Sequence, residues 1–474
     1  MSRWKKILLG IAAFVVTVVA LFLIVIGPWP VYGAADFHDA DYYQETVARI
    51  DANVDESDFA GEPRPLRAGW RKEIMTPPVG TPLGGYSARG GEPSTGVRDD
   101  LYVRAMALSD GNDTVVLIGS DMLIVPPNIA QDVREQVALR TPLTPNDLYF
   151  TASHTHCGPG SFGPGVAAKI SGGEYDPHIP ELIAEAFADA IVGAYEDLAP
   201  AKLAHGKVSA EKYIRNRTRK AEVDETLNFM LVEQENGEQC YVMRFSAHPT
   251  NFGGGMMEFS AEYPGELMKY VERATGADAV YLGGAVGSMS PRAPEASTKS
   301  GRVEALGVAL GKLVIKNAKD LVFESQTDIA SVAVAVDMPP MQMRPVSPSW
   351  RISPVGAKFF GVPAEGWIQG VRLGEDLFFI GLPFDASGEI SRQWQQEMAR
   401  QGVDLWVTGF AAAYCGYLSP DKYYDVEPLD YETGLMSWFG PNSEAYFRAL
   451  YEHIAEALKV GEAEQASPGM AAAA

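Results

Sequence analysis

Short apolar runs rich in β-branched residues alternate with segments of helical periodicity along most of this chain, and that alternation restricts the folds open to it. Strands alternating with helices build layered sheets, so the sequence predicts one large α/β (mixed α+β) domain with a mixed sheet over residues 67–460. The predicted strands are residues 115–119, 148–151, 241–245, 279–282, 330–336, 377–380 and 405–407. The predicted helices are residues 129–139, 180–198, 264–275, 302–321, 388–400 and 442–458.

Long segments rich in glycine and proline separate these elements. Loops of such length are uncommon in a compact domain unless they build a site. We therefore expect a pocket walled by loops, formed by residues 76–100, 157–175, 252–257, 283–298, 339–366 and 414–441.

The N-terminal residues 7–27 are apolar and long enough to cross a hydrocarbon core of about 30 Å. Arg3, Lys5 and Lys6 precede this segment, and no basic residue follows until Arg49. The positive-inside rule then places the N-terminus in the cytoplasm and the catalytic domain in the periplasm, lumen or extracellular space.

A cleaved signal peptide is the alternative interpretation, with residues 31–33 as a poor cleavage site. The length of the apolar run and Trp29 at its outer edge favour an uncleaved, single-pass anchor. Residues 1–6 are then a cytoplasmic tip, residues 28–66 a stalk with a docking helix, and residues 461–474 a disordered tail.

Charge and cysteine content exclude several classes of protein. The formal net charge is −22, which argues against nucleic acid as a partner. Cys157, Cys240 and Cys415 are too few for a disulfide framework and lack the spacing of a thiolate zinc site. We expect them to be small buried side chains, with one disulfide bridge as the alternative. Nothing in the sequence indicates an oligomeric state.

Histidines follow two of the predicted strands. His154 and His156 lie in SHTHCGPG (residues 153–160), and alternate residues of a strand point to one face, as two metal ligands require. His248 ends another strand in FSAHPT (residues 245–250) and is the favoured third ligand. The alternative for all three is a polar side chain that bonds nearby backbone.

Two further strand ends carry groups of the same kind. Asp385 follows residues 377–380 and offers a carboxylate, although it is equally well placed to cap the helix at residues 388–400. Tyr417 follows residues 405–407. Catalytic groups of α/β sheets gather at strand ends in this way.

In order and spacing, several motifs resemble the neutral, non-lysosomal ceramidases. They are RKEIMTPPVGTPLGGY (71–86), LYVRAMAL (101–108), SHTHCGPG (153–160), NR (216–217), HP (248–249), GSMSP (287–291) and GY (416–417). The resemblance implies an amidase with one Zn²⁺ per chain that cleaves the N-acyl bond of ceramide into a fatty acid and a sphingoid base.

The same resemblance implies roles for individual residues. The implied zinc ligands are His154, His248, Asp385 and Tyr417. Near the substrate amide it places His156, Arg217 and Tyr431, and near the metal Ser290. His156 is the candidate for proton transfer, whereas Ser290 has no adjacent histidine to activate it as a nucleophile.

Three departures from the family pattern leave the substrate open. Pro383-Phe384-Asp385 stands where the family has Pro-Gly-Glu, Ser288 stands where it has an acid, and we expect no immunoglobulin-like C-terminal domain. The alternatives are a zinc hydrolase of another N-acyl lipid or ester, and a non-catalytic binding protein tethered to the membrane. In each case the partners are a lipid-like small molecule and the membrane itself.

Overall fold

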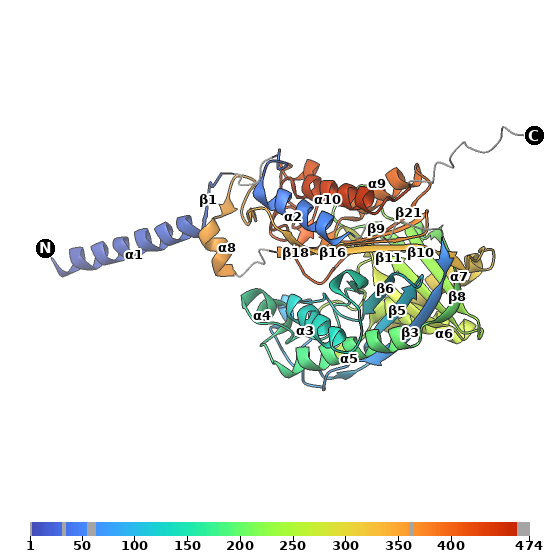
Figure 1. The fold of residues 1–474 in the computed structure, drawn as a ribbon. Coiled ribbons are helices and arrows are strands. Elements are labelled where there is room, and N and C mark those ends of the chain that lie inside the picture. The colour runs from blue at the N-terminus through green and yellow to red at the C-terminus, as the bar shows by residue number, and fades with distance from the viewer. Residues whose placement is uncertain (1, 31–34, 55–62, 361–364, 462–474) are drawn as a thin grey trace, which may run out of the picture.

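The structure, a computed structural model, describes residues 2–30, 35–54, 63–360 and 365–461. Two sheets pack face to face, and helices cover both outer faces (Figure 1). The predicted α/β fold with a large mixed sheet is therefore confirmed.

The larger sheet has 8 strands in the order β13-β11-β10-β8-β3-β5-β6-β7. Its parallel pairs are β6–β7 and β11–β13. The strands are β3 (Arg67–Ile74), β5 (Tyr102–Ser109), β6 (Thr114–Ser120), β7 (Leu148–Ala152), β8 (Ala199–Ser209), β10 (Thr226–Gln234), β11 (Gln239–Phe245) and β13 (Asp278–Gly283).

The smaller sheet has 4 strands in the order β16-β18-β19-β21, and β19 runs parallel to β21. The strands are β16 (Ile329–Asp337), β18 (Glu365–Leu373), β19 (Leu377–Gly381) and β21 (Asp404–Thr408). Tyr149, Phe379 and Trp406 are buried between the two sheets. Strands with both faces covered read as continuous apolar runs, which is why β6, β7, β19 and β21 are evident in the sequence.

Each of the six predicted helices is present, with ends within about three residues of the prediction. Helices α3 (Pro127–Ala138), α5 (His178–Glu196), α6 (Glu262–Thr275) and α7 (Lys299–Ala318) cover the larger sheet. Helices α9 (Gly388–Ala399) and α10 (Ser443–Ala457) cover the smaller one. The expected docking helix is α2 (Asp41–Asn53), which packs on β16 and α10 with Ile50 fully buried.

Five of the six predicted loops contain short regular elements, and two of them contain an α-helix. Residues 157–175 hold α4 (Val166–Gly172), and residues 339–366 hold β17 (Arg351–Ile352) and α8 (Pro354–Phe360). The prediction of irregular structure was wrong there, because elements this short show no apolar period. It also missed β3, in which the charged residues Arg71, Lys72 and Glu73 interrupt the apolar pattern, as well as β5, β8, β10 and β18.

The N-terminal helix α1 (Arg3–Val25) has a mean hydropathy of 3.1 over its most apolar window, and none of that window is buried. By length and composition it can cross a membrane, although a signal sequence has the same properties. The suggested cleavage site at residues 31–33 and the predicted tail beyond Gly461 lie outside the described residues. All three cysteines are free and buried, as expected.

Candidate metal centre

The site lies where carboxyl ends of strands from both sheets meet. The backbone N–H of Gly409, after β21, donates to the carbonyl of Gly283, at the end of β13, with an N···O distance of 3.0 Å. A Cβ on Gly283 would lie 2.0 Å from the carbonyl oxygen of Ala152, at the end of β7, so only glycine permits this approach. The strand ends predicted to carry the functional groups are therefore neighbours in space.

His154, His156 and His248 each direct a ring nitrogen to one point, and these atoms all lie within 4.8 Å of one another. The Nε2 atoms of His156 and His248 are 2.7 Å apart. His154 has a φ of 62°, a left-handed conformation that turns the chain sharply after β7. The structure thus places His156 within the group, whereas the family resemblance gave it a position beside the substrate.

The surroundings of these rings favour the neutral imidazole form, and for His154 they also determine which nitrogen carries the proton. The Nδ1 of His154 lies 2.6 Å from the carbonyl oxygen of Leu123, which can only accept, so Nε2 is the acceptor in a neutral ring. Burial, reinforced by nearby positive charge, holds the pKa of His156 and of His248 well below the usual range. Neutral imidazoles are the form that binds metal ions.

Asp385 lies beside His154 and is fully buried. Its Oδ2 lies 3.4 Å from Nε2 of His154, and neither carboxylate oxygen has a hydrogen-bond partner among the described residues. The alternative that Asp385 caps a helix is wrong, because the Ser387 side chain caps α9. A buried, unpartnered carboxylate beside imidazole lone pairs is unfavourable without a cation, and this donor set fits zinc.

Arg217 and two tyrosines form the next layer of the site. The guanidinium of Arg217 donates to the carbonyl of Gly287 and to the hydroxyl of Tyr417, the latter at 3.0 Å. Tyr417 lies opposite Asp385 in the pair β20 (Asp385–Ala386) and β22 (Tyr417–Leu418), and Arg217 lies 5.6 Å from the ring centre of Tyr431. Burial raises the pKa of Tyr417 well above its usual value, so its hydroxyl keeps the proton.

Comparison with known proteins supports the resemblance noted in the sequence. No curated protein sequence matches this chain significantly. Residues 69–274 match the family model described as neutral/alkaline non-lysosomal ceramidase, N-terminal. The resemblance to the ceramidases is thereby confirmed. The matched region includes His154, His156, Arg217 and His248, and it ends before Asp385.

Solved structures show that the fold is also that of the ceramidases. The neutral ceramidase from Pseudomonas aeruginosa matches with a TM-score of 0.71 and 18% identity, over 84% of this chain and 75% of that one. A structure described as ceramidase complexed with C2 matches with a TM-score of 0.73 and 18% identity, over 84% and 76% of the two chains.

Among the residues that the structure describes, no side-chain hydrogen bond joins Ser290 to the other predicted residues of the candidate site. It lies in β14 (Met289–Pro291), opposite Arg215 of β9 (Ile214–Asn216), and in the described part of the chain its side chain makes no hydrogen bond. Its predicted place near the metal stays a prediction. Ser288, the substitute for the family acid, is buried and bonds to the Ser387 hydroxyl, at 2.9 Å, and to the first N–H of α9.

The sequence interpretation missed two residues that touch the histidines. Phe410 stacks on His154 with 4.2 Å between ring centres, and Tyr86 lies 4.6 Å from His156. Gly85, next to Tyr86, has a φ of 104°, and a Cβ there would lie 2.6 Å from Nδ1 of His156. The glycine-rich motif at residues 71–86 was the signal that could have indicated a wall of the site.

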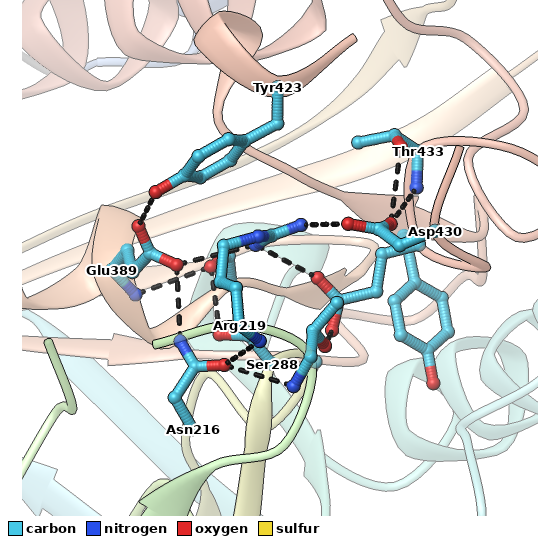
Figure 2. Close-up of polar contacts among 12 residues, drawn as sticks. Asn216, Arg219, Ser288, Glu389, Tyr423, Asp430 and Thr433 are labelled. Atoms are coloured by element: carbon cyan, nitrogen blue, oxygen red, sulfur yellow. Dashed lines mark hydrogen bonds and ion pairs between the residues drawn. The ribbon is translucent and has the colours of Figure 1, made fainter. Parts of the chain in front are cut away.

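A charged network supports the loop that carries Tyr431. Figure 2 shows the guanidinium of Arg219 between Glu389 of α9 and Asp430 of the loop, and Glu432 is its third acidic partner, at 3.3 Å. Thr218 also donates to Glu432. Because Arg217 and Tyr431 each adjoin a member of this network, it sets their relative position.

Glu432 makes folding stability depend on pH. Burial raises its pKa from 4.5 to about 7, although Thr218 and Arg219 oppose the shift. When a carboxyl group has a higher pKa in the folded state than in the unfolded state, the free energy of unfolding falls as pH rises from the unfolded-state pKa to the folded-state pKa. Here the fall is up to about 3 kcal/mol. We therefore expect Glu432→Gln to reduce the fall in unfolding free energy between pH 5 and pH 8, measured by urea denaturation. The exposed variant Glu92→Gln should keep the wild-type slope, and an unchanged slope in Glu432→Gln would contradict the assignment.

Proposed function

We propose that this protein is a membrane-anchored zinc hydrolase that cleaves the N-acyl bond of ceramide-like lipids to a fatty acid and a sphingoid base. The observation that carries the proposal is the buried carboxylate of Asp385, without a hydrogen-bond partner among the described residues, beside His154 of the three convergent histidines. The matched family model and the ceramidase folds of its structural neighbours support this chemistry.

We assign His154, His248 and Asp385 to one Zn²⁺ ion per chain, with Tyr417 as a fourth donor. When bound, zinc supplies Lewis-acid chemistry, which polarises carbonyl groups and acidifies water. His156 lies in the same group and is assigned to proton transfer, although its Nε2 is also near enough to serve as a ligand.

The other groups act on the amide itself. The Arg217 guanidinium is fixed by Gly287 and Tyr417, and it can donate to the oxygen on which negative charge develops during attack. Burial opposes its charge, but the surrounding acidic groups, Asp385 among them, outweigh that effect and raise the Arg217 pKa. Neutral His156 can accept a proton from the attacking water and return it to the leaving amine.

The contacts of the N-terminal segment support an uncleaved anchor. Directly after α1, β1 (Ile26–Gly27) pairs with β17 of the body, and the Ser353 N–H donates to the carbonyl of Val25 at 2.8 Å. Cleavage at residues 31–33 would remove this strand from the folded body. An anchor continuous with a folded element is the simpler arrangement.

One assay tests the proposed reaction. Purified full-length protein is incubated with N-acylsphingosines, other N-acyl lipids and p-nitrophenyl esters, with and without a chelator. We expect cleavage of the sphingosine amides. The chelator should lower the rate by at least about 100-fold, and added zinc should restore it. Cleavage of other substrates alone would change the substrate class, and binding without cleavage would indicate a binding protein.

A further inference from the structure

Four large apolar side chains lie exposed near the end of α1: Val346 at 61%, Val355 at 63%, Val426 at 53% and Leu435 at 55%. We name these four residues the apolar rim. Single exposed apolar residues are ordinary on a protein surface, but a group of them commonly marks a contact surface.

Contacts of Arg344 bring three of the four together. Its backbone N–H donates to the carbonyl of Gly434, at 3.3 Å, next to Leu435. Its guanidinium bonds to the carbonyl of Tyr424 and lies 3.8 Å from the carboxylate of Asp425, next to Val426. Val346 follows Arg344 by two residues, so three segments far apart in sequence, each with one exposed apolar residue of the rim, lie side by side.

The rim is continuous with the base of the apolar helix. Trp350 packs on Phe22 of α1, with 6.3 Å between ring centres, in the segment between Val346 and Val355. A Cβ on Gly356 would lie 3.0 Å from the carbonyl oxygen of Val25, so α8 abuts the end of α1, as Figure 1 shows. Aromatic residues at the end of a spanning helix sit at the membrane–water interface. The rim therefore lies close to the level at which a spanning α1 leaves the bilayer.

The other side of the rim borders the candidate site. The Met436 N–H donates to the carbonyl of Tyr431, and the Tyr417 N–H donates to the carbonyl of Met436, each at 2.9 Å. Tyr431 is 44% exposed, and its ring also faces Arg217. Backbone contacts thus connect the segment of Leu435 to Tyr431 and Tyr417 at the candidate site.

From this continuity we infer that the apolar rim is a membrane-contact surface, immersed in the outer face of the bilayer that holds α1. The partner is the boundary between lipid headgroups and acyl chains. Because the net charge is −22, apolar contact rather than attraction to anionic lipid drives this binding. A substrate then passes from the bilayer to Tyr431 without crossing water, a step that rests on the proposed function.

The kinetic test compares one amide in two physical forms. Full-length Val346→Asp/Leu435→Asp is reconstituted in phosphatidylcholine vesicles and assayed with a long-chain N-acylsphingosine in the bilayer and with a water-soluble short-chain analogue. We expect at least about fivefold loss on the bilayer substrate and less than about twofold change on the soluble one. Val322→Asp, at a site 83% exposed and away from the rim, should match wild type on both. Unchanged bilayer hydrolysis in the double variant would overturn the inference.

A second measurement tests membrane contact without using activity. It therefore remains informative if the wild type cleaves neither substrate, a result that would contradict only the proposed function. A fluorophore on Leu435→Cys or Val322→Cys reports contact with a quencher carried on the lipid headgroups, and the native cysteines are buried. We expect quenching at residue 435 and little at residue 322. Equal, weak quenching at both would refute membrane contact, and energy transfer between labelled chains at residue 435 would assign the surface to a second copy.

Discussion

Replacing His248 with alanine should remove most of the zinc from the purified protein and lower amide hydrolysis by at least about 100-fold. The ring offers one of three nitrogens that converge within 4.8 Å, and burial keeps it neutral. Changes to residues that only support a metal ligand cost about 10- to 100-fold, so loss of a ligand should cost at least as much. Elemental analysis measures zinc per chain, and release of the fatty acid measures turnover.

Matched histidine variants make that result specific. His178→Ala removes an exposed histidine at the start of α5 and should keep wild-type zinc and turnover. His156→Ala should keep zinc and lose turnover if its role is proton transfer, whereas loss of zinc would make it a ligand. Full zinc retention in both His154→Ala and His248→Ala would place the metal elsewhere.

The strand ends of this site could be predicted because the local pattern determines them. The buried strands β7, β11, β19 and β21 are short and mostly apolar, and a candidate metal ligand lies in the segment that follows each of them. The direction of each strand then indicates which end carries the functional group. That reasoning brought His154, His248 and Asp385 to one place before any contact was known.

The remaining features depend on contacts between distant segments, which no local pattern carries. The 2.7 Å approach of His156 to His248 depends on how the two edges of the larger sheet, β7 and β13, come together, since β11 pairs with β13. Arg219 contacts three carboxylates from two different segments, and Trp350 meets Phe22 across more than half the chain. The choice between a ligand and a cap for Asp385 also needed the contacts of Ser387.

Asp385→Asn should lower turnover by at least about 10-fold and reduce zinc content. An aspartate is one methylene shorter than the family glutamate, so its backbone must lie nearer the metal, because zinc–oxygen distances vary little. The structure holds that backbone firmly. Phe384 packs on Phe447 of α10 at 4.7 Å, and a Cβ on Gly287 would lie 2.5 Å from the carbonyl oxygen of Asp385. Asp385→Glu should therefore also lose activity, since the longer side chain exceeds the space set for the shorter one.

Folding stability in chelator separates a ligand from a merely structural residue. Without metal, the wild-type carboxylate is buried and has no hydrogen-bond partner among the described residues, which is destabilising by about 1–3 kcal/mol. Asparagine removes the negative charge, so Asp385→Asn should unfold at higher denaturant than wild type in chelator and at lower denaturant with zinc. Ser387→Ala, which removes the cap of α9, should destabilise the protein in both conditions. If Asp385→Asn instead keeps wild-type zinc and turnover, the histidines and Tyr417 alone hold the metal, and the carboxylate has no part in binding it.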